Sequence, residues 1–180
     1  MKNILLGVTG SIAAYKAADL ANQLTKAGYS VRVVMTRSAA EFVTPLTFQT
    51  LTKHKVHMDM FEPFAYEDVR HISLAQEADL LLIAPATANI IGKLASGIAD
   101  DMLSTVAMAV RGAPVLICPA MNTAMYENPV VRGNMEKLAA LGYAFVEPKE
   151  SRLACGDAGK GALADVEVIM GRVGELLPTR

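Results

Sequence analysis

Residues 4–16 read ILLGVTGSIAAYK and join three local patterns. The apolar run 4–8 has the length of a buried strand, Gly10 and Ser11 form a small polar break, and an Ala-rich region with helical spacing begins at Ile12. This order predicts a strand, a tight turn and the start of a helix. The unpaired N–H groups of a helix start suit a phosphate, but a strand-to-helix turn also needs glycine for its geometry alone. The segment by itself leaves both interpretations open.

The glycine spacing of this turn differs from the dinucleotide-binding fingerprint. That fingerprint is GxGxxG, whereas here Gly7 and Gly10 are followed by Ala13. A mononucleotide therefore fits the turn better than a dinucleotide, and a nicotinamide-dependent dehydrogenase ranks last among the functions considered.

The composition predicts one domain with a substantial core. The chain has 180 residues, of which 52% are hydrophobic, and we expect a single domain over residues 1–180. A net charge of -1 provides no general attraction to nucleic acid or to an anionic membrane. Two cysteines, no signal-peptide pattern and no apolar run of membrane-spanning length favour the cytoplasm. Ten methionines predict apolar surface at a subunit interface.

Five short apolar segments have the composition of buried strands, and the segments between them have helical spacing. Such alternation predicts an α/β fold, in which a parallel sheet is covered by helices on both faces. Residues 53–76 show poor periodicity and contain all three histidines, which is typical of a binding loop or an interface, and residues 151–165 are expected to form a Gly-rich polar loop. The expected strands are 4–8, 31–35, 79–84, 115–118 and 143–146, and the expected helices are 12–27, 45–51, 90–95, 101–110, 129–141 and 166–177.

Small polar residues follow four of the expected strands. Gly10 and Ser11 follow the first, and residues 36–38, 87–89 and 120–122 follow the next three. The carboxyl ends of parallel strands meet at one edge of a sheet. In Rossmann-like (flavodoxin-like) folds, ligands bind at that edge, where the strand order reverses. The recurrence of these segments predicts a ligand site there.

Four motifs occur in an order that points to one family: GSIAAYK, PATAN followed by GIADD, PAMNTAMYENP and ACGDAGKG, together with an isolated His71. The set closely resembles the flavin-dependent cysteine decarboxylases, and among them the branch that acts on 4′-phosphopantothenoylcysteine in coenzyme A biosynthesis. The resemblance spans nearly the whole chain, and PAMN-x-x-M and the ACGD loop are its most specific parts. Peptidyl-cysteine decarboxylases and flavin prenyltransferases share the fold but not this pair of motifs.

The resemblance implies bound FMN and a homotrimer or an assembly of trimers, with FMN at a subunit boundary. It also implies a phosphopantothenoylcysteine synthetase as a fused or separate partner. In the phosphopantothenoylcysteine branch of this family, the flavin oxidises the thiol-bearing carbon of the substrate, CO2 leaves, and the resulting enethiol is reduced to 4′-phosphopantetheine. The residues that the resemblance places around FMN are Gly10, Ser11, Ile12, Thr36, Ser38, Thr87, Ala88, Asn89 and Ala120.

Two polar side chains are candidates for proton transfer and for holding the substrate. The family match places His71 as the active-site base, because a neutral imidazole is available near neutral pH; without that match, a surface histidine is the simpler interpretation. Asn122 of PAMN can hold the substrate carboxylate or amide, or it can cap the helix that follows, and the two roles are compatible. His54 and His57 have no such support, and the histidines lack metal-ligand spacing.

The two cysteines differ in their surroundings. Cys118 lies in the apolar segment LIC and is expected to be a buried small hydrophobic residue. Cys155 lies in the Gly-rich loop, and the resemblance assigns it as the acid that protonates the enethiol, because an ordinary thiol is mostly protonated at neutral pH. Ala162 stands where many family members have arginine, so a substrate contact is lost or moved to Lys160. The other residues expected to bind substrate are Asn122, Met125, Ala154 and Gly156.

Two alternative functions are compatible with the same fold. One is a flavin-bound regulatory protein, although such proteins usually carry long acidic extensions, which this sequence lacks. The other is a peptidyl-cysteine decarboxylase that stops at the enethiol, and the presence of Cys155 in its loop argues against it.

Overall fold

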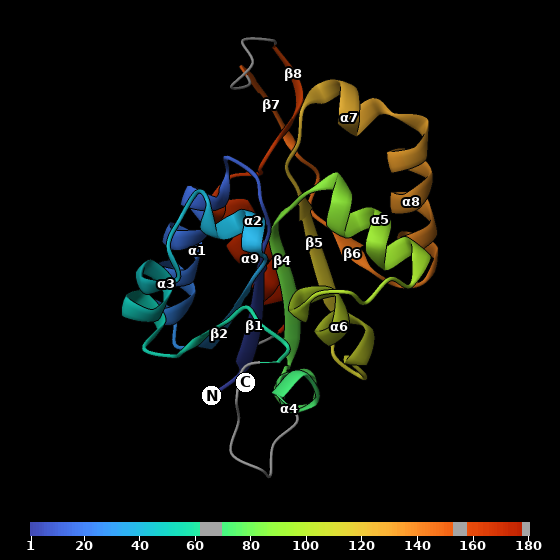
Figure 1. Cartoon of the computed structure of the whole chain (residues 1–180). Helices are drawn as coiled ribbons and strands as arrows, with labels where there is room; N and C mark the ends of the chain where they lie inside the picture. Colours follow the sequence, from blue (N-terminus) through green and yellow to red (C-terminus); the bar gives the residue numbers. More distant parts are fainter. Residues whose placement is uncertain (62–69, 153–157, 178–180) are drawn as a thin grey trace.

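The computed structural model describes residues 1–61, 70–152 and 158–177, which are built around a six-stranded parallel sheet (Figure 1). The strand order is β3-β2-β1-β4-β5-β6, so the order reverses between β1 and β4. This arrangement confirms the predicted α/β fold. In chain order the strands are β1 Asn3–Val8, β2 Ser30–Met35, β3 Val56–His57, β4 Leu80–Ala86, β5 Val115–Pro119 and β6 Ala144–Phe145.

Helices cover both faces of the sheet, as the sequence pattern predicts (Figure 1). One face carries α1 Ala14–Lys26, α2 Arg37–Ala40, α3 Pro45–Thr52 and α9 Val166–Leu176. The other face carries α4 Arg70–Glu77, α5 Ala88–Ser96, α6 Met102–Ala109, α7 Thr123–Glu127 and α8 Pro129–Ala140. Within the described ranges, no helix is long and apolar enough to cross a membrane.

Strand side chains alternate between two hydrophobic cores, because successive residues of a strand point to opposite faces. In β1, Leu6 and Val8 belong to the core under α1 and α9, whereas Leu5 belongs to the core under α5 and α6. Gly7 also faces α6: a Cβ at this position would lie 2.6 Å from Cδ1 of Leu103. The glycine inside the first apolar run therefore allows α6 to pack closely against β1.

The prediction that residues 53–76 form one long irregular segment is only partly correct. Residues 56–57 form β3, an edge strand paired with β2, and α4 begins at Arg70. A strand of two residues is too short to produce a periodic signal, and α4 buries only Leu74 and Ala75 of its eight residues. Two short helices, α2 and α7, were also not predicted.

The prediction of a Gly-rich loop over residues 151–165 is wrong for residues 151–152 and 158–162, whereas residues 163–165 are a loop. Strands β7 Lys149–Arg152 and β8 Ala158–Ala162 form an antiparallel hairpin. Its glycines allow close packing, because a Cβ at Gly159 would lie 2.6 Å from Oγ1 of Thr123, and one at Gly161 would overlap the carbonyl oxygen of Met121. The N–H of Met121 donates to the Gly161 carbonyl at 2.9 Å. The hairpin is thus attached to the segment that begins α7.

Candidate functional site

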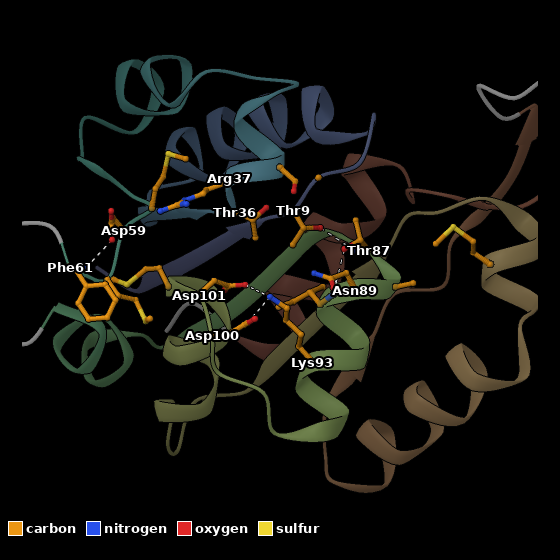
Figure 2. A pocket seen from close by; sticks show the side chains of 18 residues that line it. Thr9, Thr36, Arg37, Asp59, Phe61, Thr87, Asn89, Lys93, Asp100 and Asp101 are labelled. Atoms are coloured by element: carbon orange, nitrogen blue, oxygen red, sulfur yellow. Dashed lines mark hydrogen bonds and ion pairs between the residues drawn. The ribbon is translucent and has the colours of Figure 1, made fainter.

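A cavity of about 580 Å³ lies at the carboxyl ends of the strands, where the strand order reverses (Figure 2). Its volume is typical of a small-molecule site. Most of its lining follows the strands directly. The lining residues are Thr9 and Gly10 after β1, residues 36–38 after β2, residues 58–61 after β3, residues 87–90 with Lys93 after β4, residues 100–102 before α6, and Met125 in α7.

Thr9 connects the two strands at the reversal point. Its buried hydroxyl donates to the carbonyl of Pro85 at 2.6 Å and accepts from the N–H of Thr87 at 3.1 Å (Figure 2). Pro85 lies in β4, which extends beyond the predicted end at Ala84, and the Ala84–Pro85 peptide is cis. The start of α5 is therefore held in a defined position relative to the end of β1.

The turn after β1 packs tightly against the turn after β2. A Cβ at Gly10 would overlap Cβ of Ser38 and would lie 3.1 Å from its backbone carbonyl carbon. Thr36 caps α2 by accepting from the N–H of Ala39 at 3.2 Å. Gly10 is thus required by close approach, which is one of the two interpretations that the sequence left open.

The cavity brings together many of the residues predicted to bind cofactor or substrate, but not all of them. Within the described part of the chain, Ser11, Ile12 and Ala120 lie outside the lining: Ser11 Oγ accepts from the N–H of Ala13 at 3.3 Å, Ile12 is exposed and Ala120 is buried. The predicted residues that line it are Gly10, Thr36, Ser38, Thr87, Ala88, Asn89 and Met125.

The candidate catalytic residues are not grouped in this cavity. Among the described residues, His71 and Asn122 are not part of its lining. His71 is the second residue of α4, which lies near the end of the sheet where β1 and β4 begin (Figure 1). Asn122 caps α7, since its Oδ1 accepts from the N–H of Ala124 at 2.8 Å. The predicted site residues Ala154, Cys155 and Gly156 lie outside the described residues.

Lys160, predicted to contact substrate, takes part in a network beside α7. Its Nζ donates to Oε2 of Glu147 at 2.6 Å, and the hydroxyl of Tyr126 donates to the same oxygen at 2.8 Å. Burial, together with the Glu147 carboxylate, raises the pKa of Tyr126. Cys118 is fully buried, as predicted, and burial raises the pKa of its thiol far above the ordinary value.

A cluster of three charged side chains forms one wall of the cavity, and the sequence analysis did not single it out. Nζ of Lys93 in α5 lies 2.6 Å from Oδ1 of Asp100 and 2.6 Å from Oδ2 of Asp101 (Figure 2). Lys93 is four residues after Asn89, which places the two on one face of α5. That spacing, with the GIADD motif, was the available sequence signal, but it could not show that the motif folds back onto α5.

Asp101 is ionised by its surroundings and also begins α6. Its Oδ1 accepts from the N–H of Ser104 at 2.8 Å, and the Ser104 hydroxyl accepts from the N–H of Asp101 at 3.1 Å, which forms a capping box. Burial opposes ionisation, but hydrogen bonds from Lys93 and Ser104 outweigh it and lower the pKa of Asp101. Burial likewise opposes the charge of Lys93, and the hydrogen bonds to Asp100 and Asp101 outweigh it and raise the pKa of Lys93.

The family follows from comparison with known proteins. The flavoprotein family model matches residues 1–177, so the chain belongs to the flavoprotein family. A protein of Streptococcus mutans described as a probable phosphopantothenoylcysteine decarboxylase is 50% identical over 177 residues, which cover 98% of this chain and 99% of the relative. The coenzyme A biosynthesis bifunctional protein CoaBC of Bacillus subtilis is 52% identical over 169 residues, which cover 94% of this chain and 41% of that relative. The chain thus spans about two fifths of the bifunctional relative.

Solved structures show the same architecture. A cysteine-to-serine mutant of PPC decarboxylase in complex with pantothenoylaminoethenethiol superposes with a TM-score of 0.92 at 33% identity and covers 99% of both chains. The FMN-binding protein AtHal3 superposes with a TM-score of 0.88 at 33% identity, over 99% of this chain and 98% of that chain.

Asp101→Asn keeps the helix cap but removes the charge that faces Lys93. Because the pKa of Asp101 is lowered in the folded protein, its ionisation stabilises the fold above the unfolded pKa, and this contribution is lost as the pH falls through the folded pKa. We expect the variant to lower the free energy of unfolding by about 1 kcal/mol at pH 7, and the difference from wild type to shrink below about pH 4. Urea unfolding at a series of pH values measures this difference. A difference that stays constant down to pH 3 would contradict the assignment.

Proposed function

We propose that this protein is an FMN-dependent decarboxylase that converts 4′-phosphopantothenoylcysteine into 4′-phosphopantetheine, in the cytoplasm and within coenzyme A biosynthesis, as a single domain over residues 1–180. The observation that carries the proposal is the end-to-end match, at 50% identity, to the S. mutans protein described as a probable decarboxylase of this substrate. A cavity of suitable size at the reversal point of the sheet supports it.

The residues present at the cavity fit FMN. Gly10 and Ser38 approach so closely that only a glycine can stand in the first turn, and both residues line the cavity. The first turn of α5, at residues 87–90, lies in the lining, and a helix start favours an anionic phosphate. Bound FMN would supply a two-electron acceptor for the thiol-bearing carbon of the substrate and later return both electrons. Gly10, Thr36, Ser38, Thr87, Ala88 and Asn89 are proposed to hold it, with Ser11, Ile12 and Ala120 next to them.

Asn122 is proposed to orient the substrate carboxylate. Its Oδ1 is bonded to the N–H of Ala124, which fixes the rotation of the side chain. Met125, one turn further along α7, lies in the cavity lining. A carboxylate aligned from this segment would lose CO2 once the adjacent carbon chain has been oxidised at the thiol-bearing carbon, because the thiocarbonyl accepts the electron pair of the broken bond. Lys160, in the middle of β8, remains a proposed substrate contact.

His71 is proposed to act as the base from a neighbouring subunit. It does not line the described cavity of its own chain, whereas an arrangement of trimers with FMN at the boundary brings residues of a second copy to the site. Exposed apolar side chains on several elements support such an assembly: Ile12, Phe42, Phe61, Ile72 and Met125.

Cys155 is proposed to donate the proton in the last step, with Ala154 and Gly156 as substrate contacts beside it. The step adds two electrons and two protons to the enethiol, and the thiol supplies one of these protons. The solved cysteine-to-serine mutant of PPC decarboxylase is in complex with a ligand that contains an ethenethiol, which is the species expected when this reduction is blocked. The bifunctional relative supports a synthetase, fused or separate, as the source of the substrate.

The first test uses the purified wild-type protein. We expect a yellow protein with a flavin spectrum that, when given 4′-phosphopantothenoylcysteine, releases CO2 and forms saturated 4′-phosphopantetheine by mass spectrometry. A yellow protein that leaves this substrate unchanged would overturn the substrate assignment. A protein that takes up no FMN would overturn the cofactor assignment.

Cys155→Ser separates decarboxylation from reduction. We expect the variant to release CO2 and to accumulate the enethiol, lighter than 4′-phosphopantetheine by the mass of H2, because serine is a much weaker acid than cysteine. In Asn122→Ala, by contrast, we expect the rate of CO2 release to fall about a hundredfold. Normal formation of the saturated product by Cys155→Ser would show that the proton donor is another group. The matched control is Cys118→Ser, which changes a cysteine that is buried in the sheet core.

Gly10→Ala tests the close approach at the cavity. The added Cβ overlaps Ser38, so we expect FMN affinity to fall at least about tenfold and the unfolding free energy to fall by about 1–3 kcal/mol. Fluorescence titration with FMN and urea unfolding measure the two effects. Gly133→Ala in α8 is the control, because its Cβ would have no neighbour within 4 Å. Equal FMN affinity in Gly10→Ala and Gly133→Ala would contradict the proposed cradle.

A further inference from the structure

The charged cluster in the cavity wall combines one cation with two anions at short range. Nζ of Lys93 is within 2.6 Å of a carboxylate oxygen of both Asp100 and Asp101. The side chain of Lys93 is 17% exposed and that of Asp101 is 29% exposed, whereas that of Asp100 is 60% exposed. The wall therefore carries a net charge of about one negative unit, with its cation at the centre.

The two carboxylates are held differently. Asp101 is fixed by the capping box of α6 as well as by Lys93, so it cannot leave the wall without breaking the start of that helix. Asp100 has only Lys93 as an ion-pair partner among the described residues. All three residues line the same cavity as Asn89 and Thr87, which lie on α5 and at its cap (Figure 2).

We infer that Lys93 is a positioning residue for the cofactor, acting through Asp100 and Asp101: its charge compensates the two carboxylates so that the cavity accepts an anionic flavin and tolerates the negative charge that flavin reduction adds. This inference rests on the proposed function, because it assumes that the cavity holds FMN. It goes further in assigning control of the flavin potential to a residue outside the strand-end segments.

Several charges would share a confined space when FMN is bound in this cavity. FMN carries a negative phosphate, and the uptake of two electrons and one proton by a flavin adds one more negative charge. Carboxylates in the same cavity repel the phosphate and also the charge that reduction adds to the flavin. An ammonium group between the carboxylates reduces this repulsion. Charges in a partly enclosed cavity are screened less by salt than charges on an open surface. Removal of the ammonium alone would double the negative charge of the wall.

Lys93 could instead serve only as a mechanical link between α5 and the segment before α6. The electrostatic role and the mechanical role differ in which second substitution would restore the function. In Lys93→Met the wall has two carboxylates and no cation, whereas in Lys93→Met with Asp100→Asn the net charge of the wall returns to one negative unit. The double variant restores the charge but not the link, because Asp101 remains without its cation.

The experiment measures FMN affinity by fluorescence titration and the flavin reduction potential by equilibration with a reference dye. For Lys93→Met, we expect FMN binding about tenfold weaker than in wild type and a more negative potential. The double variant should recover affinity to within about twofold of wild type and move the potential back. Asp100→Asn alone should make the potential more positive, which tests the inference even if Lys93→Met fails to fold. Lys137→Met, an equal change of charge on the exposed end of α8, is the control.

The outcomes separate this inference from the proposed function. If wild type binds FMN and Lys93→Met matches it in affinity and potential, the inference alone is overturned. If the double variant is as defective as Lys93→Met, the role of Lys93 is mechanical, and the inference is again overturned. A wild-type protein that takes up no FMN would overturn the proposed function and this inference together.

Discussion

The hydroxyl of Thr9 joins the carboxyl ends of the two central strands, and the geometry of the cavity depends on this joint. One oxygen both accepts from the N–H of Thr87 and donates to the carbonyl of Pro85, which also accepts from the backbone N–H of Thr9 at 3.3 Å. A neutral hydrogen bond of this kind contributes only about 1 kcal/mol, whereas a buried group left without a partner costs about 1–3 kcal/mol. The joint therefore constrains position more than it adds stability. The turn after β1 and the start of α5 are held together as one rigid edge.

On one side of this edge, two turns are held by close backbone packing, and on the other side α5 is held by ion pairs. Gly10 lets the turn after β1 pack against Ser38, and a side chain there would fill the space where the two turns meet. On the opposite side, Lys93 connects α5 to the segment before α6 through two carboxylates. The first feature brings the turns after β1 and β2 into contact, and the second sets the charge of one cavity wall.

Three of the four segments predicted from strand ends contribute residues to the cavity lining, and residues 120–122 do not. The agreement of the three has a simple reason. In a parallel sheet every strand points the same way, so residues that follow strands are neighbours in space even when they are far apart in sequence. Thr36, Thr87 and Asn89 could be selected on this basis. Lys93 and Asp101 could not, because neither follows a strand directly, and their pairing requires α6 to begin beside α5. The hairpin of β7 and β8 was missed because glycines that allow close packing look, in a sequence, like glycines of a flexible loop.

The sequence alone determined the α/β class, the positions of the long helices and the edge of the sheet at which the cavity lies, because local periodicity and the direction of parallel strands follow from the chain itself. The motif resemblance added the family, which the full-length match confirms. Only the tertiary structure decided that Thr9 connects the end of β1 to Pro85 and Thr87, that Lys93 stands between two aspartates, and that His71 lies outside the cavity lining of its own chain within the described residues. These features depend on contacts between segments that are distant in sequence, or between one helix and the segment before the next helix. They depend on packing distances that no local pattern contains.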